Sequence, residues 1–384
     1  DLIRDLRCEM SLLGNDDRTL LDMVSLLESE NIAMVHQVLA EDLEYEKWLG
    51  DRGRPIIIKL NAILCNLVLT LNKASSRNEG MKKLANRTEQ IACDFRLLTE
   101  SSELADSLRW VDKAKGSFTI HLSPIDISQT IGRLFSNTAW IFCSATLTID
   151  GNFSHIQKAL GVEKATGKVF ASPFDFRKQV KAYLPFELPK PGTDAHTHAL
   201  VDSIIPILRS NSGRTFFLCT SYRALHIVRQ RLSGCFPILC QGDLPRRELL
   251  LAFRKTLRSV LIATHSFWQG VDLKGANLTC VVIDKLPFAS PQDPLVEATM
   301  KATNKRGGNG FVDYLLPQAI IRLNQGFGRL IRSESDRGLF VLGDPRIKSR
   351  HYGEIVLSSL PDMEWIEIDG ACKYLSELSE CSSD

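Results

Sequence analysis

Several sequence features that carry chemistry in nucleotide- and metal-binding proteins are missing from this chain of 384 residues. It has no G-x-x-x-x-G-K-[ST] phosphate loop and no D-E-A-H sequence, and the glycine-rich stretch at 307–310 is not followed by Lys-Ser or Lys-Thr. None of its ten cysteines forms a C-x-x-C pair, so we expect no metal or iron–sulfur site within the chain. Cys143, Cys219 and Cys280 lie in apolar runs and are predicted to be small core residues.

The chain also lacks a strong charge of either sign, since its formal net charge is +2. Any nucleic-acid binding must therefore come from a local basic face. We find no signal peptide and expect no apolar run long enough to span a membrane. Free thiols suit a reducing compartment, so a cytoplasmic location is expected. The length, together with 44% hydrophobic residues, indicates two or three domains with sizeable cores.

The most informative feature present is the segment from Gln325 to Arg332, which reads Q-G-F-G-R-L-I-R. If the segment is helical, Gln325, Arg329 and Arg332 project from one face, because residues three and four apart are neighbours on a helix. Two guanidinium groups on one face favour an anion, and guanidinium matches phosphate geometry. The alternative, a solvated basic helix face, is the commoner explanation of an isolated R-x-x-R. The added glutamine and glycines favour a polyphosphate site.

Other short segments occur along the chain in an order that resembles a known family. They are Ser144-Ala145-Thr146, Thr220-Ser221-Tyr222-Arg223, Phe267-Trp268-Gln269-Gly270-Val271-Asp272, and Leu286-Pro287-Phe288 with the prolines that follow. Together with the glutamine–arginine segment, they resemble the superfamily two iron–sulfur DNA helicases of the DinG/YoaA and XPD type. The resemblance is specific from about residue 101 to 346. In that family the phosphate loop, the cluster cysteines and the D-E-A-H box precede the S-A-T segment. We therefore expect the C-terminal portion of a longer helicase.

The resemblance implies a role for each matching residue. Gln325, Arg329 and Arg332 would act on the γ-phosphate of ATP as catalytic residues. Nucleotide binding and its coupling to DNA would involve Gly270, Asp272, Gly328, Ser144 and Thr146. Contacts to single-stranded DNA would come from Thr220, Ser221, Tyr222, Arg223, His265, Ser266 and Trp268. From local sequence alone, a helix cap is an equally good explanation of Asp272, and packing between domains is an equally good explanation of Trp268.

The resemblance also implies an ATP-dependent DNA helicase that moves 5′ to 3′ along single strands in DNA repair or replication. Its partners would be single-stranded or forked DNA and DNA-repair or replication proteins. ATP and Mg²⁺ would require the first motor domain, and the iron–sulfur cluster is expected only in the full-length family. The chain alone is predicted to be inactive as an ATPase, because nothing in it would hold the β-phosphate or the magnesium ion. The alternative is a non-enzymatic remnant that binds single-stranded DNA or a partner protein.

Hydrophobic periodicity predicts three regions. Residues 1–115 carry apolar residues at helical spacing and resemble the helical arch of this family. Residues 116–150 resemble the tail of the first RecA-like motor domain, with a strand at 118–124, a short helix at 131–135 and a second strand at 139–143. Residues 151–384 alternate short apolar strands with amphipathic helices, which predicts an α/β fold whose parallel sheet is covered on both faces. This region is the expected second RecA-like domain.

The elements expected in this last region can be stated by residue number. Strands are predicted at 168–171, 180–184, 215–219, 236–239, 260–263, 278–283 and 338–342. Helices are predicted at 199–209, 222–232, 245–253, 294–301, 312–332 and 347–360, with Pro317 kinking or restarting the fifth. Ligands of parallel sheets bind at the carboxyl ends of the strands, and two of the named segments follow predicted strands there.

Overall fold

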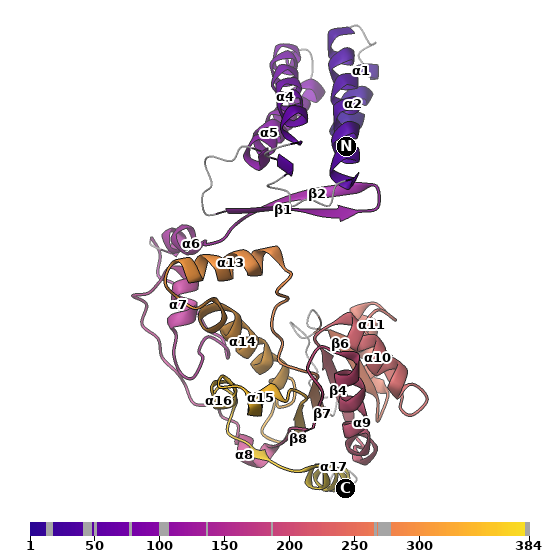
Figure 1. Ribbon diagram of the computed structural model, residues 1–384, viewed down its shortest axis with the longest axis vertical. Coiled ribbons are helices and arrows are strands. Elements are labelled where there is room, and N and C mark those ends of the chain that lie inside the picture. Colours follow the sequence, from indigo (N-terminus) through magenta and orange to yellow (C-terminus); the bar gives the residue numbers. More distant parts are fainter. Residues whose placement is uncertain are drawn as a thin grey trace. The chain divides into compact units, whose positions relative to one another are not determined.

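The computed structural model describes residues 1–12, 18–40, 48–49, 52–76, 79–99, 107–135, 137–185, 187–264, 267 and 278–380. The described chain divides into two compact units (Figure 1). The first contains residues 1–126 and 292–299, and the second contains residues 127–291 and 300–384.

The first unit is a helical bundle with a β-hairpin. Its helices are α1 (Leu2–Leu12), α2 (Arg18–Ala40), α4 (Arg54–Ala74) and α5 (Glu79–Thr99), and its strands are β1 (Ser107–Ala114) and β2 (Ser117–Pro124). One face of the antiparallel hairpin, which includes Val111, Phe118 and Ile120, packs against the apolar core of the helices. The helical prediction for residues 1–115 is therefore wrong at 107–114. The predicted strand at 118–124 is confirmed, although its partner is β1.

Helix α4 is long enough and apolar enough to cross a membrane by length and composition. This corrects the expectation that no such run is present. The core helices of folded domains pass the same test, and eight side chains of α4, among them Leu67 and Leu71, are buried within the bundle. Polar residues such as Asn61 and Asn66 interrupt the apolar run in the sequence.

The second unit contains a seven-stranded parallel sheet in the order β5-β6-β4-β7-β8-β3-β9. Figure 1 labels β6, β4, β7 and β8 of this sheet. The strands are β3 (Val180–Tyr183), β4 (Arg214–Cys219), β5 (Ile238–Cys240), β6 (Val260–Thr264), β7 (Leu278–Ile283), β8 (Gly338–Leu342) and β9 (Glu364–Trp365). The described helices are α6 (Ser128–Phe135), α7 (Ser154–Leu160), α8 (Phe176–Gln179), α9 (Asp194–Ser210), α10 (Tyr222–Leu232), α11 (Arg246–Lys255), η1 (Gly310–Leu315, a π-helix), α14 (Leu316–Phe327), α15 (Arg346–Ser349), α16 (Gly353–Ser358) and α17 (Ile368–Glu380). Helix α13 (Pro294–Lys305) spans the division between the units.

The sheet is covered on both faces because its buried side chains alternate. Phe217 and the other residues on one face pack with α9, α10 and α17, whereas Phe216 and its neighbours on the opposite face pack with α11, α14 and α16. All residues of β4, β6 and β8 are buried. The predicted α/β fold, with a helix-covered parallel sheet after a mostly helical region, is confirmed.

Several local predictions in this unit are wrong. Residues 139–143 and 168–171 are not in strands, and Cys143 is exposed rather than buried, whereas Cys219 and Cys280 are buried as expected. The predicted helix 347–360 is two short helices, α15 and α16. The predicted helix 312–332 is interrupted near Pro317, as expected, but it also ends at Phe327. Strand β9 and helix α17 were not foreseen.

Candidate functional site

The arginine-bearing segment leaves the helix before the first arginine. Helix α14 ends at Phe327, and a tight turn follows in which the N–H of Arg329 donates to the carbonyl of Gly326 (3.2 Å). The N–H of Leu330 similarly donates to Phe327 (2.9 Å). The prediction that Gln325, Arg329 and Arg332 share one helix face is therefore wrong in its geometry.

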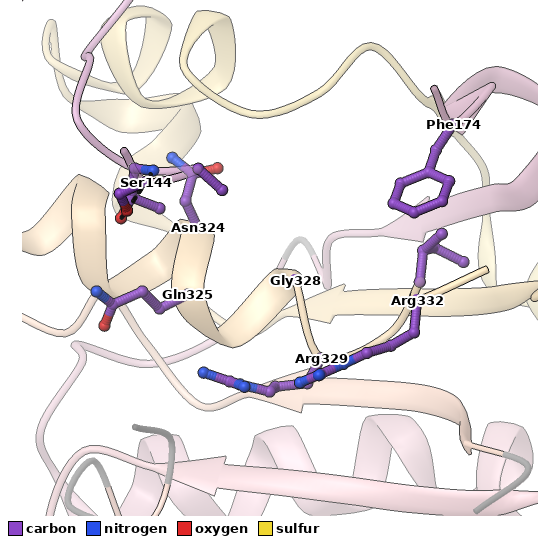
Figure 2. A pocket seen from close by; sticks show the side chains of 10 residues that line it. Ser144, Phe174, Asn324, Gln325, Gly328, Arg329 and Arg332 are labelled. Atoms are coloured by element: carbon purple, nitrogen blue, oxygen red, sulfur yellow. Dashed lines mark hydrogen bonds between the residues drawn. The ribbon is translucent and has the colours of Figure 1, made fainter. Parts of the chain in front are cut away.

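The turn nevertheless brings all three side chains to one pocket of about 530 Å³ (Figure 2). The pocket is lined by Ser144, Ala145, Thr146, Phe174, Asn324, Gln325, Gly328, Arg329, Ile331 and Arg332. Six of the predicted site residues, Gly328 among them, thus meet although they come from segments almost 180 residues apart in the chain. The volume falls within the range of small-molecule sites, about 300–1,000 Å³.

Two arginines contribute to the wall of the pocket. Arg329 and Arg332 line it, and its described lining residues include no aspartate or glutamate. The side-chain oxygen of Gln325 is buried and has no hydrogen-bond partner within the described part of the chain. Burial without a partner is costly for a polar atom, so a ligand or water that donates a hydrogen bond to this oxygen would be stabilised there. The arrangement suits a polyanion that guanidinium groups can bind in a bidentate manner.

The S-A-T segment borders this pocket as a turn. The Ser144 hydroxyl accepts the N–H of Thr146 (3.2 Å), and the two hydroxyl oxygens lie 3.3 Å apart. Ser144 is exposed and Thr146 is partly buried. Both hydroxyls therefore remain near the mouth of the pocket, where a hydroxyl has a second lone pair and a proton available for a ligand.

Two pocket residues lie outside every segment that the sequence singled out. Asn324 donates its amide to the carbonyls of Ile320 (3.2 Å) and Ser359 (3.1 Å), and so ties the end of α14 to the segment after α16. Phe174 is edge-on to Phe176, which in turn contacts Phe327. Asn324 adjoins the predicted glutamine and could have been found on that signal, whereas nothing in the local sequence indicates Phe174.

Gly328 adopts ordinary right-handed helical geometry, with φ −63°. The backbone conformation therefore does not require glycine. A Cβ at this position would nevertheless lie 3.2 Å from the carbonyl oxygen of Asn324, which is tighter than most Cβ contacts. The predicted contact between Gly328 and a nucleotide stays a prediction.

The T-S-Y segment lies at the carboxyl end of β4, and two of its hydroxyls already have structural partners. Thr220 donates its backbone N–H (3.0 Å) and its hydroxyl (3.1 Å) to the buried carboxylate of Asp284. Ser221 is the N-cap of α10 and accepts the N–H of Ala224 (3.2 Å). Burial raises the pKa of Asp284, and the donors from Thr220 work in the opposite direction. The backbone N–H and the hydroxyl proton of Thr220 are thus already used to fix the end of the strand.

The remaining two residues of this segment are more accessible. Tyr222 is 59% exposed, and its hydroxyl accepts a hydrogen bond from the Gln241 side chain (3.3 Å). Arg223 is exposed and forms an ion pair with Asp194 (2.6 Å), which raises its pKa and offsets its charge. The predicted sites His265, Ser266, Trp268, Gly270 and Asp272 lie outside the described residues.

Comparison with known proteins supports the same relationship. Residues 204–363 match the family model of the helicase C-terminal domain. The chain is 37% identical over 293 residues to the ATP-dependent DNA helicase YoaA of Haemophilus influenzae, covering 75% of this chain and 46% of that protein. It is 36% identical over 251 residues to the ATP-dependent helicase DinG of Mycobacterium tuberculosis, covering 63% and 38%. The chain thus spans less than half the length of these relatives.

Solved structures agree at the level of the fold. An XPD helicase structure superposes with a TM-score of 0.54 at 14% identity, covering 78% of this chain and 56% of that chain. The Xpd4 structure of S. tokodaii gives 0.52 at 17% identity, covering 80% and 58%. The matching domain model and the sequence identity show that the chain carries a helicase C-terminal domain and is homologous to DinG/YoaA helicases over the part that it shares with them.

Proposed function

We propose that this chain provides the arginine-bearing side of an ATP site and a single-strand-binding face in an ATP-dependent DNA helicase of the 5′ to 3′ type. The observation that carries the proposal is the pocket in which Gln325, Arg329 and Arg332 meet Ser144 and Thr146. Two of its described lining residues are arginines, and guanidinium groups match the geometry of the terminal phosphate of a nucleoside triphosphate.

In this role the two arginines would bind the oxygens of the γ-phosphate and stabilise the negative charge that develops during its transfer. Loss of such an arginine typically lowers the rate by about three to five orders of magnitude. Within the described part of the chain, the carbonyl oxygen of Gln325 has no partner, which suits it to orient the attacking water by accepting a hydrogen bond from it. Binding of the β-phosphate and Mg²⁺ would require a phosphate loop that the sequence of this chain does not contain.

Segment 137–148 supports a role for a further α/β body in completing the site. Trp140, Ile141 and Phe142 are exposed by 55%, 89% and 41%, although the segment is as apolar as a buried strand. Residues 139–143 pair with no described strand. Short apolar segments of this kind commonly form the buried strands of a parallel sheet. We therefore propose that this segment joins the first motor domain and so positions the S-A-T turn.

The DNA face would lie at the carboxyl end of β4. The exposed ring of Tyr222 is available to stack on a base, a contact worth about 1–3 kcal/mol. The hydroxyl proton of Ser221 stays available to a phosphate oxygen while its lone pair caps α10. This binding would be independent of base sequence and sensitive to salt.

Binding and turnover of the 384-residue chain test the proposal together. We expect no ATP hydrolysis by the chain alone, with or without single-stranded DNA. Fluorescence anisotropy should show binding of labelled oligo-dT that weakens as salt rises from 50 to 200 mM. Tyr222→Ala should weaken this binding about tenfold, whereas Lys373→Ala, at an exposed lysine of α17, should not.

Two results would contradict the proposal. ATP hydrolysis that is stimulated by DNA and abolished by Arg329→Ala would show that the chain contains a complete motor. Absence of DNA binding at 50 mM salt would refute the proposed single-strand-binding face. Inorganic tripolyphosphate provides a separate test of the pocket, because its binding should depend on both Arg329 and Arg332.

A further inference from the structure

A buried glutamine lies next to the segment that carries the second arginine. Gln179 is the last residue of α8 and is 2% exposed. Its side-chain nitrogen lies 2.9 Å from the carbonyl oxygen of Ser333, 3.2 Å from that of Glu334 and 3.0 Å from that of Asp336. An amide has two N–H groups, so the three carbonyls share them.

Gln179 is itself fixed in place. The residue lies between α8 and β3, and its backbone carbonyl accepts the hydroxyl of Tyr374 from α17 (3.1 Å). Strand β3 pairs with β8, which begins at Gly338, immediately after the loop that Gln179 contacts. Gln179 therefore ties the loop at 333–336 to the sheet.

The same loop is closed by a carboxylate onto the backbone of the arginine. Asp336 Oδ2 accepts the backbone N–H of Arg332 (2.7 Å) and that of Ser333 (2.8 Å). Asp336 is thus bonded to the arginine through its side chain and to Gln179 through its carbonyl. On the other side of Arg332, Ile331 is 5% exposed and packs in the core.

We infer that Gln179 and Asp336 are positioning residues, which hold the backbone of Arg332 so that its guanidinium enters the pocket. The inference rests on the proposed role of that pocket as a polyphosphate site. Arginine loses side-chain entropy whenever it binds, and a fixed backbone lowers the number of conformers that must be given up. Gln179 lies outside the Q-x-x-G-R-x-x-R segment by almost 150 residues, so no local pattern indicates it.

The test uses the whole chain and inorganic tripolyphosphate as the probe, with calorimetric titration. Gln179→Leu removes both donors at nearly constant volume. We expect it to weaken tripolyphosphate binding about tenfold. This is the effect of losing the one charge-assisted contact that Arg332 would make with the probe. In an Arg332→Ala background it should have no further effect, whereas in an Arg329→Ala background the tenfold loss should remain.

Asn211→Leu is the matched control. Asn211 is also a buried amide (3% exposed) in the same unit, and it bonds Thr215, Gly213 and Thr279. This variant should lower stability without changing the affinity for tripolyphosphate. If Gln179→Leu does not fold, as judged by circular dichroism, Asp336→Asn tests the same loop from its other side, because it retains one acceptor oxygen and loses the charge.

Hydrogen exchange separates failure of this inference from failure of the proposed function. Exchange at residues 330–337 should rise in Gln179→Leu, while the protected strand β7 should not change. Equal affinity for tripolyphosphate in Gln179→Leu, or a further tenfold loss in the Arg332→Ala background, would overturn the inference. If wild type does not bind tripolyphosphate at all, the polyphosphate site is wrong. The exchange result alone then decides the positioning, and unchanged exchange at 332–333 refutes it.

Discussion

Asp344 provides the sharpest stability prediction, because its carboxylate is completely buried and has several partners. It accepts the backbone N–H groups of Leu286 (2.8 Å) and Arg346 (3.0 Å). The guanidinium of Arg346 binds the same carboxylate through two nitrogens, at 2.9 and 2.7 Å, and lies over the ring of Phe288. One side chain thus joins the Leu-Pro-Phe segment after β7 to the segment after β8.

Asp344→Asn keeps the volume of the side chain, so it adds no cavity. It removes the charge that pairs with Arg346 and replaces one acceptor oxygen by a donor. Breaking a buried ion pair from one side costs about 3–5 kcal/mol. The Arg346 side chain is 28% exposed, so water can partly solvate it and we expect the lower end, about 3 kcal/mol. For a unit of this size, that corresponds to a fall in Tm of roughly 6–12 °C.

The assay is thermal unfolding followed by circular dichroism at neutral pH, with Asp194→Asn as the control. Asp194 pairs with Arg223 on the surface, where both side chains are substantially exposed. The same chemical change there should cost less than about 1 kcal/mol. A fall of less than 2 °C for Asp344→Asn, or a fall equal to that of the control, would refute the reasoning.

Three further predictions address a turn, a buried histidine and a helix cap. Gly242→Ala should destabilise the protein, because φ is +102° there. Gly370→Ala in α17 should instead stabilise it by about 0.5–1 kcal/mol, because a Cβ has room in that helix. Equal Tm shifts for the two variants would contradict this. Burial lowers the pKa of His196, whose ring bonds the Gly343 carbonyl, so its stabilisation is present above pH about 6.5 and is lost as pH falls through the lowered pKa. Urea titrations from pH 7 to 5 should therefore show an unfolding free energy that falls with pH, and His196→Gln should reduce this slope. An unchanged slope would count against this role. Ser221→Asp should preserve the cap of α10 and hence Tm, but weaken oligo-dT binding. Ser221→Ala should lower the unfolding free energy by about 1 kcal/mol, because the cap is lost. Oligo-dT binding that is unaffected by Ser221→Asp would argue against a phosphate contact.

The sequence was most informative where a local pattern dictates the structure. Strands β7 and β8 have the predicted bounds, because short runs of β-branched and other apolar residues have few alternatives to a buried strand. Helix α10 also has the predicted bounds, since Ser221 caps it at one end. The prediction failed at 139–143, where an equally apolar run pairs with no described strand. A strand needs a neighbour, and local sequence does not say whether one is present.

By itself, then, the sequence determined the fold class, the family and the residues of the glutamine–arginine segment. Only the tertiary structure decided how those residues meet. The arginines reach one pocket through a turn after Phe327 rather than along a helix face, and Ser144 and Phe174 join them from distant segments. The long-range hydrogen bonds of Gln179, Asp284 and Asp344 were likewise invisible in the sequence. A buried polar group acts through partners far away in the chain, and folding alone brings those partners within hydrogen-bond distance.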